Sequence, residues 1–570
     1  MKIMKRKLNI LLSLVGFFLV IPRVCAQTPK GYTELIGMTL DAADSAESIE
    51  QRKETLKMFD SAFRQYPDSI ESEGLYGASV IATALGEKDK AFNYLDQLLV
   101  QGRDEYGFYG WYHIIYGEAQ EDFSGLKNDA RWGSLMAQAR FMQVRFMEQL
   151  KRSEEEFYLT KSYGKEEWSA LSDEELYRLL RGDSQYLNKI EREYSLSFMV
   201  NDSTKTSFFV FLPQGYDPEK RYPLLFFLHG AVKHNLFSDF LTEEEVRLQC
   251  GKFISNSAAK SDVILVFPKG NKQYNWMNPD DGFFMIPAIL RQIKQSINVD
   301  DNRVFVMGHS NGATGAFSYM MKQPSDFAGF YGFNTYPKVF TGGTFVENIL
   351  NRSYVAITTD LDYYYPPKAN DTLTYLMSQI GADYREYRYE GFPHWFPYLD
   401  ESKPAVETIF EDIKARTRNP FPPRITWEFD DNKYGTIDWV TEAKLDPIET
   451  KAKWHSDALN FDITEWLEYN EGDSLIVVPV EKKAFDFPRA SGKFVAEYAD
   501  NTFRVQSSCI ASFCVNISPQ MVDMSKPVII YWNDKLCYSG IVSIDRNFML
   551  RNFQENRDRK SLWVNRICIQ

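Results

Sequence analysis

Residues 303–322, RVFVMGHSNGATGAFSYMMK, decide the fold that we expect for this chain. The run from Val304 to Met307 is apolar and predicts a buried strand, and the run after Gly312 predicts a helix. Gly308, Ser310 and Gly312 form a G-x-S-x-G pattern between the two. A sharp strand-to-helix turn strains the serine backbone, and flanking glycines let neighbouring chain approach closely. The pattern therefore predicts a nucleophile elbow, which exposes the Ser310 hydroxyl at the carboxyl edge of a sheet.

Further strand-like runs lie on both sides of this elbow. Residues 283–299 predict a helix between two of them. Strands that alternate with helices imply a largely parallel sheet covered on both faces, so we predict an α/β domain over residues 194–418. The expected strands are residues 194–200, 207–212, 224–228, 263–267, 354–357 and 384–389.

The segments outside this domain have different sequence patterns. Residues 27–155 carry apolar residues at helical spacing, with breaks at Pro67 and Gly86. These helix–turn–helix pairs resemble tetratricopeptide repeats, and a plain helical bundle is the alternative. Residues 156–193 form a charged connector. After the proline-rich linker at 419–423, short apolar runs separated by turn signals predict a small antiparallel β-rich domain over residues 419–570.

The first 26 residues predict an exported protein. A basic start is followed by an apolar run, and small residues precede Gln27, as in a secretory signal peptide. We expect a periplasmic or extracellular location; lipid anchoring at Cys25 is the less favoured alternative. No later stretch is long and apolar enough to predict a membrane span. The net charge of −13 argues against nucleic acid as the main partner.

Cysteine usage fits an oxidising compartment. Signal removal would leave five cysteines, which allow one or two disulfides near the C-terminus or buried free thiols. Their spacing matches no metal-binding pattern, and we expect no metal and no organic cofactor. These cysteines are Cys250, Cys509, Cys514, Cys537 and Cys568.

A serine nucleophile needs a base that takes its proton and a carboxylate that orients the base. In the order expected for this elbow, the acid and then the histidine follow the serine. His394 follows a predicted strand and is the candidate base. Asp362 follows the strand before it and is the candidate acid, with Asp360 as the alternative.

A developing oxyanion needs two backbone donors. The N–H of Asn311, directly after the serine, is one candidate. The N–H of Ala231 is the other, because it follows a strand that ends at Leu228. His229 is interpreted as a residue that shapes this loop, and His309 as one that packs on the elbow.

Residues 209–230, FVFLPQGYDPEKRYPLLFFLHG, and the region 300–317 resemble the secreted feruloyl and acetylxylan esterase-like group of the α/β hydrolases. The resemblance covers about residues 195–415. It implies an α/β-hydrolase fold and hydrolysis of a carboxylic ester, in a small molecule or a polysaccharide, through an acyl-enzyme. In such esterases the stretch with Tyr274 and Trp276 borders the site, where both could stack on substrate.

Two other functions stay open at this point. A serine peptidase of prolyl-oligopeptidase type has the same elbow, although its usual propeller does not match a helical N-terminal third. A non-catalytic binding protein with a retired hydrolase core is the second alternative. The helical domain could also hold a protein partner.

Overall fold

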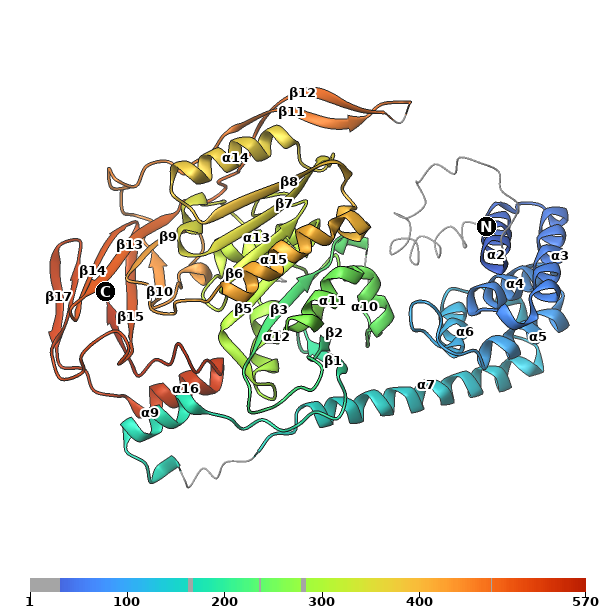
Figure 1. Cartoon of the computed structure of the whole chain (residues 1–570), viewed down its shortest axis with the longest axis horizontal. Helices are drawn as coiled ribbons and strands as arrows, with labels where there is room; N and C mark the ends of the chain where they lie inside the picture. The colour runs from blue at the N-terminus through green and yellow to red at the C-terminus, as the bar shows by residue number, and fades with distance from the viewer. Residues whose placement is uncertain (1–30, 162–167, 235–236, 278–282, 473) are drawn as a thin grey trace. The chain divides into compact units, whose positions relative to one another are not determined.

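The computed structural model describes residues 31–161, 168–234, 237–277, 283–472 and 474–570 (Figure 1). The predicted signal peptide, residues 1–26, lies outside these ranges. Contacts divide the chain into two compact units. One comprises Met1–Glu155 with Leu241–Gln249, and the other Glu156–Phe240 with Cys250–Gln570. Across the described ranges, no helix combines the length and apolarity that a membrane crossing needs.

The first unit is helical, as the sequence predicted. Ser48 caps α3 through a capping box with Gln51, which satisfies backbone donors at the helix start. Gly86 ends α4 with φ of 75°, a conformation that glycine adopts at little cost. The core contains Phe59, Leu75 and Leu95, all fully buried. The helices are α2 (Tyr32–Ser45), α3 (Ile49–Gln65), α4 (Ser72–Leu85), α5 (Lys88–Leu99), α6 (Gly110–Ala119) and α7 (Ala130–Phe157).

The second unit is built on an eight-stranded sheet with the order β1-β2-β4-β3-β5-β6-β7-β8. β1, β2 and β4 pair antiparallel, and the pairs from β4–β3 to β7–β8 are parallel. The sequence patterns missed β6, a short strand that contains two glycines. The strands are β1 (Glu193–Met199), β2 (Lys205–Phe211), β3 (Tyr222–Leu228), β4 (Ile264–Pro268), β5 (Val299–His309), β6 (Gly329–Phe333), β7 (Ser353–Leu361) and β8 (Tyr384–Pro393).

Helices cover both faces of this sheet (Figure 1). α13 packs on β3, β5 and β6, while α11 contacts α15 on the other face. The helix expected over 283–299 is shorter, because the chain must turn after residue 293 for β5 to begin at Val299. The helices of the second unit up to this point are α9 (Asp173–Gly182), α11 (Lys252–Lys260), α12 (Met285–Ile293), α13 (Asn311–Lys322), α14 (Pro367–Gln379) and α15 (Lys403–Ala415). Nearly all of α10 (Glu243–Cys250) belongs to the first unit.

The C-terminal segment adds β-structure to the same unit. It forms a five-stranded sheet, β17-β16-β14-β13-β9, a three-stranded sheet, β10-β15-β18, and the hairpin β11–β12. The strands are β9 (Arg424–Phe429), β10 (Val440–Leu445), β11 (Asp462–Tyr469), β12 (Leu475–Lys483), β13 (Gly492–Ala499), β14 (Thr502–Ser508), β15 (Ile510–Ile517), β16 (Val528–Trp532), β17 (Lys535–Gly540) and β18 (Asn565–Ile569), with α16 (Arg546–Asn556) before the last.

The expectation of a purely antiparallel module is wrong in one place. β14 pairs parallel with β16, because the intervening strand β15 leaves for the other sheet. Elsewhere the pairing is antiparallel, and Asp500 and Asn501 turn between β13 and β14 with positive φ. A disulfide joins Cys514 to Cys568, which face each other across β15 and β18.

Buried ion pairs tie this β-structure to the eight-stranded sheet. Nζ of Lys322, at the end of α13, lies 3.0 Å from Oδ1 of Asp430, which directly follows β9. Arg559 donates to Asp301 in β5 at 2.8 Å, and Arg418 donates to Asp558 at 2.8 Å. Because leaving one of these charges unpaired in the interior is costly, the pairs fix the C-terminal segment on the sheet.

Candidate active site

The strand-to-helix turn holds Ser310 in a strained conformation, with φ of 56° and ψ of −121°. Its N–H donates to the carbonyl of Phe333 at 3.0 Å. A Cβ on Gly312 would lie 1.8 Å from the carbonyl oxygen of Leu228, so no other residue fits there. Ser310 itself is half-buried and directly follows the carboxyl end of β5.

His394 and Asp362 meet after the last two strands of the sheet. Nδ1 of His394 donates to Oδ1 of Asp362 at 2.8 Å, and both side chains are buried, with exposed fractions of 2% and 3%. The same carboxylate oxygen accepts the N–H of Tyr364 at 3.0 Å. Nε2 of His394 is buried and makes no hydrogen bond with any residue in the described ranges. The imidazole is thus oriented at one nitrogen and available to take a proton at the other.

The residues that flank Ser310 also hold the loop of His394. The carbonyl of His394 accepts Nε2–H of His309 at 2.8 Å and Nδ2–H of Asn334 at 2.9 Å. Asn334 follows β6 in the left-handed conformation, with φ of 51°. Because β6 was missed in the sequence, so was Asn334. Its signal would have been an asparagine directly after a strand, a residue that tolerates this conformation.

Two further histidines near the site remain neutral at ordinary pH. Burial, and then the neighbouring charge of His394, lower the pKa of His309 to about 3. Burial, and then Lys269, lower the pKa of His229 to about 3. Nε2 of His229 accepts the N–H of Gly270 at 3.1 Å. Both histidines therefore fit the structural roles expected of them, one at the elbow and one in the loop after β3.

The loop after β3 lies directly against the serine. A Cβ on Gly230 would be 3.1 Å from the Cβ of Ser310, so the backbone passes as close as glycine permits. Ala231 follows with φ of 50°. The N–H of Val232 donates to Oδ1 of Asn311 at 3.2 Å, which ties this loop to the first residue of α13. The structure thus brings the loop that contains Ala231 next to both Ser310 and Asn311.

Three other residues were predicted as members of the site: Asp360, Trp276 and Tyr274. Oδ1 of Asp360 accepts the N–H of Gly391 at 2.7 Å, a bond that joins the ends of β7 and β8 rather than one made with His394. Trp276 is fully buried, so the prediction that it stacks on substrate is corrected: its indole occupies the space that Gly315 leaves on α13. Tyr274 is partly exposed and stacks on Phe237 at 6.0 Å, and its role at the substrate stays a prediction.

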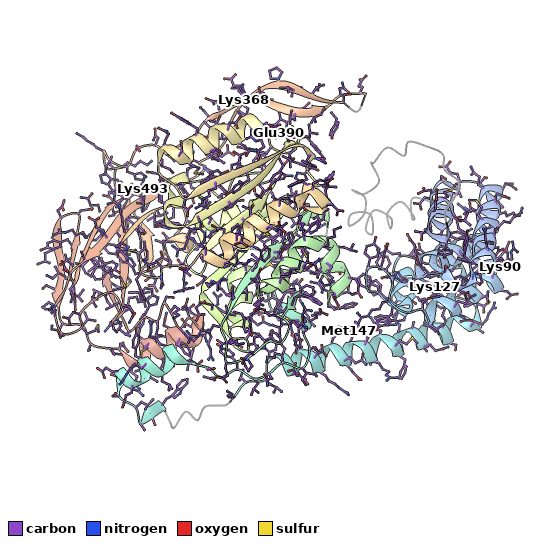
Figure 2. The ribbon with its side chains drawn as sticks, viewed as in Figure 1. Lys90, Lys127, Met147, Lys368, Glu390 and Lys493 are labelled. Atoms are coloured by element: carbon purple, nitrogen blue, oxygen red, sulfur yellow. A yellow bond between two sulfur atoms is a disulfide. The ribbon has the colours of Figure 1, made fainter. Side chains whose placement is uncertain are left out.

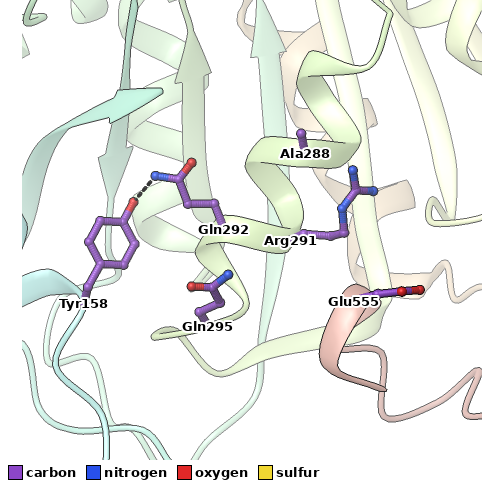
Figure 3. A pocket seen from close by; sticks show the side chains of 6 residues that line it. All are labelled: Tyr158, Ala288, Arg291, Gln292, Gln295 and Glu555. Atoms are coloured by element: carbon purple, nitrogen blue, oxygen red, sulfur yellow. Dashed lines mark hydrogen bonds between the residues drawn. The ribbon is translucent and has the colours of Figure 1, made fainter. Parts of the chain in front are cut away.

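Two cavities lie away from these residues. One, of about 500 Å³, is open to solvent and lies beside α12 (Figure 3). Two of the residues that line it, Gln292 and Tyr158, are joined by a hydrogen bond of 2.5 Å that the Gln292 side chain donates. The other, of about 530 Å³, lies in the helical unit and is lined by side chains that include Tyr76, Glu73 and His113. Neither contains a member of the Ser310 site. Within the described ranges, no cluster of His, Cys, Asp and Glu could hold a metal ion.

Residues 203–335 match the model of a family described as "Putative esterase". This stretch includes Ser310, Ala231 and Asn311. The match supports an α/β hydrolase of the esterase class for this part of the chain. Among curated proteins, no sequence match was found.

Solved structures similar to this chain include a thermostable esterase, with 20% identity over 40% of this chain and 64% of that one, at a TM-score of 0.33. A ferulic acid esterase is 18% identical over 38% of this chain and 96% of its own chain, at a TM-score of 0.31. A Bacteroides ovatus protein described as a "putative dipeptidyl aminopeptidase IV" is 14% identical over 39% of this chain and 36% of its own, at a TM-score of 0.32. Likeness at this level does not discriminate between ester and peptide substrates.

Proposed function

We propose that this protein is a serine hydrolase that cleaves carboxylic esters through an acyl-enzyme. One observation carries the proposal: Nδ1 of the buried His394 is hydrogen-bonded to Asp362 at 2.8 Å, and Nε2 makes no hydrogen bond with any residue that the structure describes. The loop that carries this histidine is held by His309, the residue before the strained Ser310. The esterase family match over residues 203–335 supports the same class of reaction.

In this proposal, Ser310 Oγ attacks the ester carbonyl while His394 takes its proton at Nε2. Asp362 keeps the proton on Nδ1 and stabilises the imidazolium that forms. The backbone N–H groups of Ala231 and Asn311 donate to the oxyanion. The imidazolium then protonates the leaving alcohol, and water repeats the sequence on the acyl-enzyme to release the acid.

We further propose that the substrate is a carbohydrate-linked or other small carboxylic ester and that the protein acts after export. The resemblance of residues 209–230 to secreted feruloyl and acetylxylan esterases motivates the substrate class. The basic and apolar pattern of residues 1–26 motivates export. A panel of feruloyl, acetyl-sugar and acyl-lipid esters, assayed beside an Xaa-Pro amide, tests the substrate class against the peptidase alternative. Faster turnover of the amide would overturn it.

Replacement of the nucleophile tests the reaction. Ser310→Ala should lower the turnover of a short ester by about 10⁴-fold or more and abolish covalent labelling by a fluorophosphonate. Ser378→Ala changes an exposed serine on α14 and serves as the matched control, with wild-type labelling and turnover expected. If Ser310→Ala is folded by circular dichroism and still hydrolyses the ester, Ser310 is not the nucleophile. If wild-type protein is neither labelled nor active, the core is non-catalytic.

A further inference from the structure

The hairpin β11–β12 belongs to the C-terminal β-structure, yet it reaches the loop that carries the candidate acid. The ring of Tyr469, the last residue of β11, lies 5.2 Å from the ring of Tyr363. Tyr363 in turn contacts Tyr364, with ring centroids 4.2 Å apart and a hydrogen bond of 2.9 Å between the two hydroxyls. The ring of Tyr364 lies 4.2 Å from that of His394. Three tyrosines therefore form a continuous series from the hairpin to the candidate base.

We call Tyr364, Tyr363 and Tyr469 the tyrosine row, and parts of their rings are exposed to solvent. Tyr469 is 54% exposed and Tyr364 is 39% exposed, and Tyr363 is half-buried between them. Exposed rings that adjoin a buried catalytic centre differ from isolated surface tyrosines, because they supply flat faces next to the reacting atoms. Tyrosine also has few rotatable bonds, so little conformational entropy is lost when it contacts a ligand.

The hairpin is fixed in this position by contacts along its length. It runs over α14 (Figure 1). Lys368 of that helix, labelled in Figure 2, has its Nζ 3.2 Å from a carboxylate oxygen of Glu465 in β11. Glu465 and Tyr469 lie on the same face of the strand, because side chains alternate with a period of two. The ion pair and the Tyr469–Tyr363 contact thus both join β11 to the sheet domain.

A second group of contacts joins both strands of the hairpin to the loops after β6 and β7. Trp466 packs against Tyr336 at 6.1 Å and against the buried Tyr365 at 6.2 Å. Lys482 of β12 donates to the hydroxyl of Tyr336 at 3.2 Å and lies over the ring of Trp466 at 5.2 Å. These contacts involve the residue next to Tyr364, so the orientation of the tyrosine row depends on the hairpin.

The position of the row relative to His394 indicates which part of a substrate it would meet. In the proposed reaction, Nε2 of His394 must come within hydrogen-bonding distance of the leaving alcohol oxygen. A surface that begins at the His394 ring therefore lies beside the alcohol portion of the ester. Flat tyrosine faces favour a ring in that portion, since aromatic rings stack on them and sugar rings present an apolar face to them.

We infer that the C-terminal hairpin completes the substrate site, with Tyr469, Tyr363 and Tyr364 binding a ring in the alcohol part of the ester. This inference rests on the proposed function and specifies its substrate: an ester of a sugar or an aryl alcohol. Tyr469 is then a specificity residue contributed from outside the segment that matches the esterase family.

The experiment compares three butyrate esters whose alcohol parts are methyl, benzyl and glucosyl. Tyr469→Ala should lower kcat/KM for the benzyl or the glucosyl ester by about 3- to 10-fold, mainly through KM, and leave methyl butyrate unchanged. Tyr469→Phe keeps the ring and should restore wild-type values. Tyr375→Ala removes a 65% exposed tyrosine from α14 and is the matched control, with no change expected.

The outcomes separate the two proposals. Suppose that wild-type protein hydrolyses methyl butyrate but Tyr469→Ala has the wild-type kcat/KM for all three esters. The tyrosine row then does not bind substrate, and the proposed hydrolase function stands. Equal losses on all three esters would also overturn the inference, because they would show a general effect on the site. If wild-type protein hydrolyses none of the esters and is not labelled at Ser310, the proposed function itself fails. The benzyl and glucosyl arms identify which ring the row accepts.

Discussion

Asp362 and Asp360 lie two residues apart, and the structure assigns them different tasks that substitution can separate. Oδ1 of Asp362 accepts Nδ1–H of the buried His394 at 2.8 Å, whereas Oδ1 of Asp360, at the exposed end of β7, accepts the N–H of Gly391 in β8 at 2.7 Å. Asp362→Asn and Asp360→Asn remove the same charge from each position and preserve the side-chain volume. The pair is therefore a matched test of which carboxylate orients the base.

The magnitude follows from what Asp362 does in the site. An asparagine there can present its amide N–H₂ to Nδ1, which would place the histidine proton on Nε2 and prevent it from taking the serine proton. Loss of the correct tautomer in a Ser–His–Asp site of known mechanism costs about 10⁴-fold in kcat, which corresponds to about 5 kcal/mol of transition-state stabilisation. We expect a loss of this order for Asp362→Asn.

Asp360→Asn should behave differently. Its amide oxygen can still accept the N–H of Gly391, so only the charge contribution to one hydrogen bond is lost. We expect kcat within about threefold of wild type and a decrease in unfolding free energy of about 1 kcal/mol.

The assay is steady-state hydrolysis of a short ester at several pH values, with thermal unfolding as the check that both variants fold. If Asp362→Asn retains kcat within tenfold of wild type, Asp362 does not orient the base. If Asp360→Asn loses as much activity as Asp362→Asn, the assignment of the two aspartates is reversed or shared.

Three further predictions concern packing and charge. Gly312→Ala should prevent folding of the sheet domain, because the new Cβ would overlap the backbone carbonyl of Leu228. In Gly37→Ala, on α2, the new Cβ meets nothing within 4 Å, and the substitution should stabilise the helical unit by about 1 kcal/mol. Thermal unfolding measures both effects. Trp276→Ala should lower the unfolding free energy by about 3–5 kcal/mol in urea titrations and leave the ranking of ester substrates unchanged, since the indole is fully buried. Burial alone would raise the pKa of Asp558, but the charges of Arg418 and Lys294 hold it well below the ordinary value. Its stabilising contribution is therefore complete above about pH 4 and is lost as pH falls further, so wild-type urea midpoints should decrease more steeply below pH 4 than those of Asp558→Asn.

Much of the architecture could be predicted from local patterns. Buried parallel strands are continuous apolar runs, and β3, from Tyr222 to Leu228, is buried at every residue, so such runs were readily recognised. Breaks at Pro67 and Gly86 likewise indicated where α3 and α4 end in the first unit. The strand β6 escaped detection because its sequence, GFYGF, owes its conformation to neighbours on both sides rather than to propensity.

The sequence by itself determined the chemistry that we propose, because G-x-S-x-G between a strand and a helix, with an acid and a histidine following in order, limits the candidates to a few residues. Only the tertiary structure decided between Asp362 and Asp360 as the hydrogen-bond partner of His394, since the two are only two residues apart and the end of β7 falls between them. It also placed Trp276 in the core. The contact between Tyr469 and Tyr363 joins residues far apart in the chain, and no local pattern encodes such a distance. Local sequence fixes which groups are present, whereas the packing of the hairpin on the sheet domain fixes what they face.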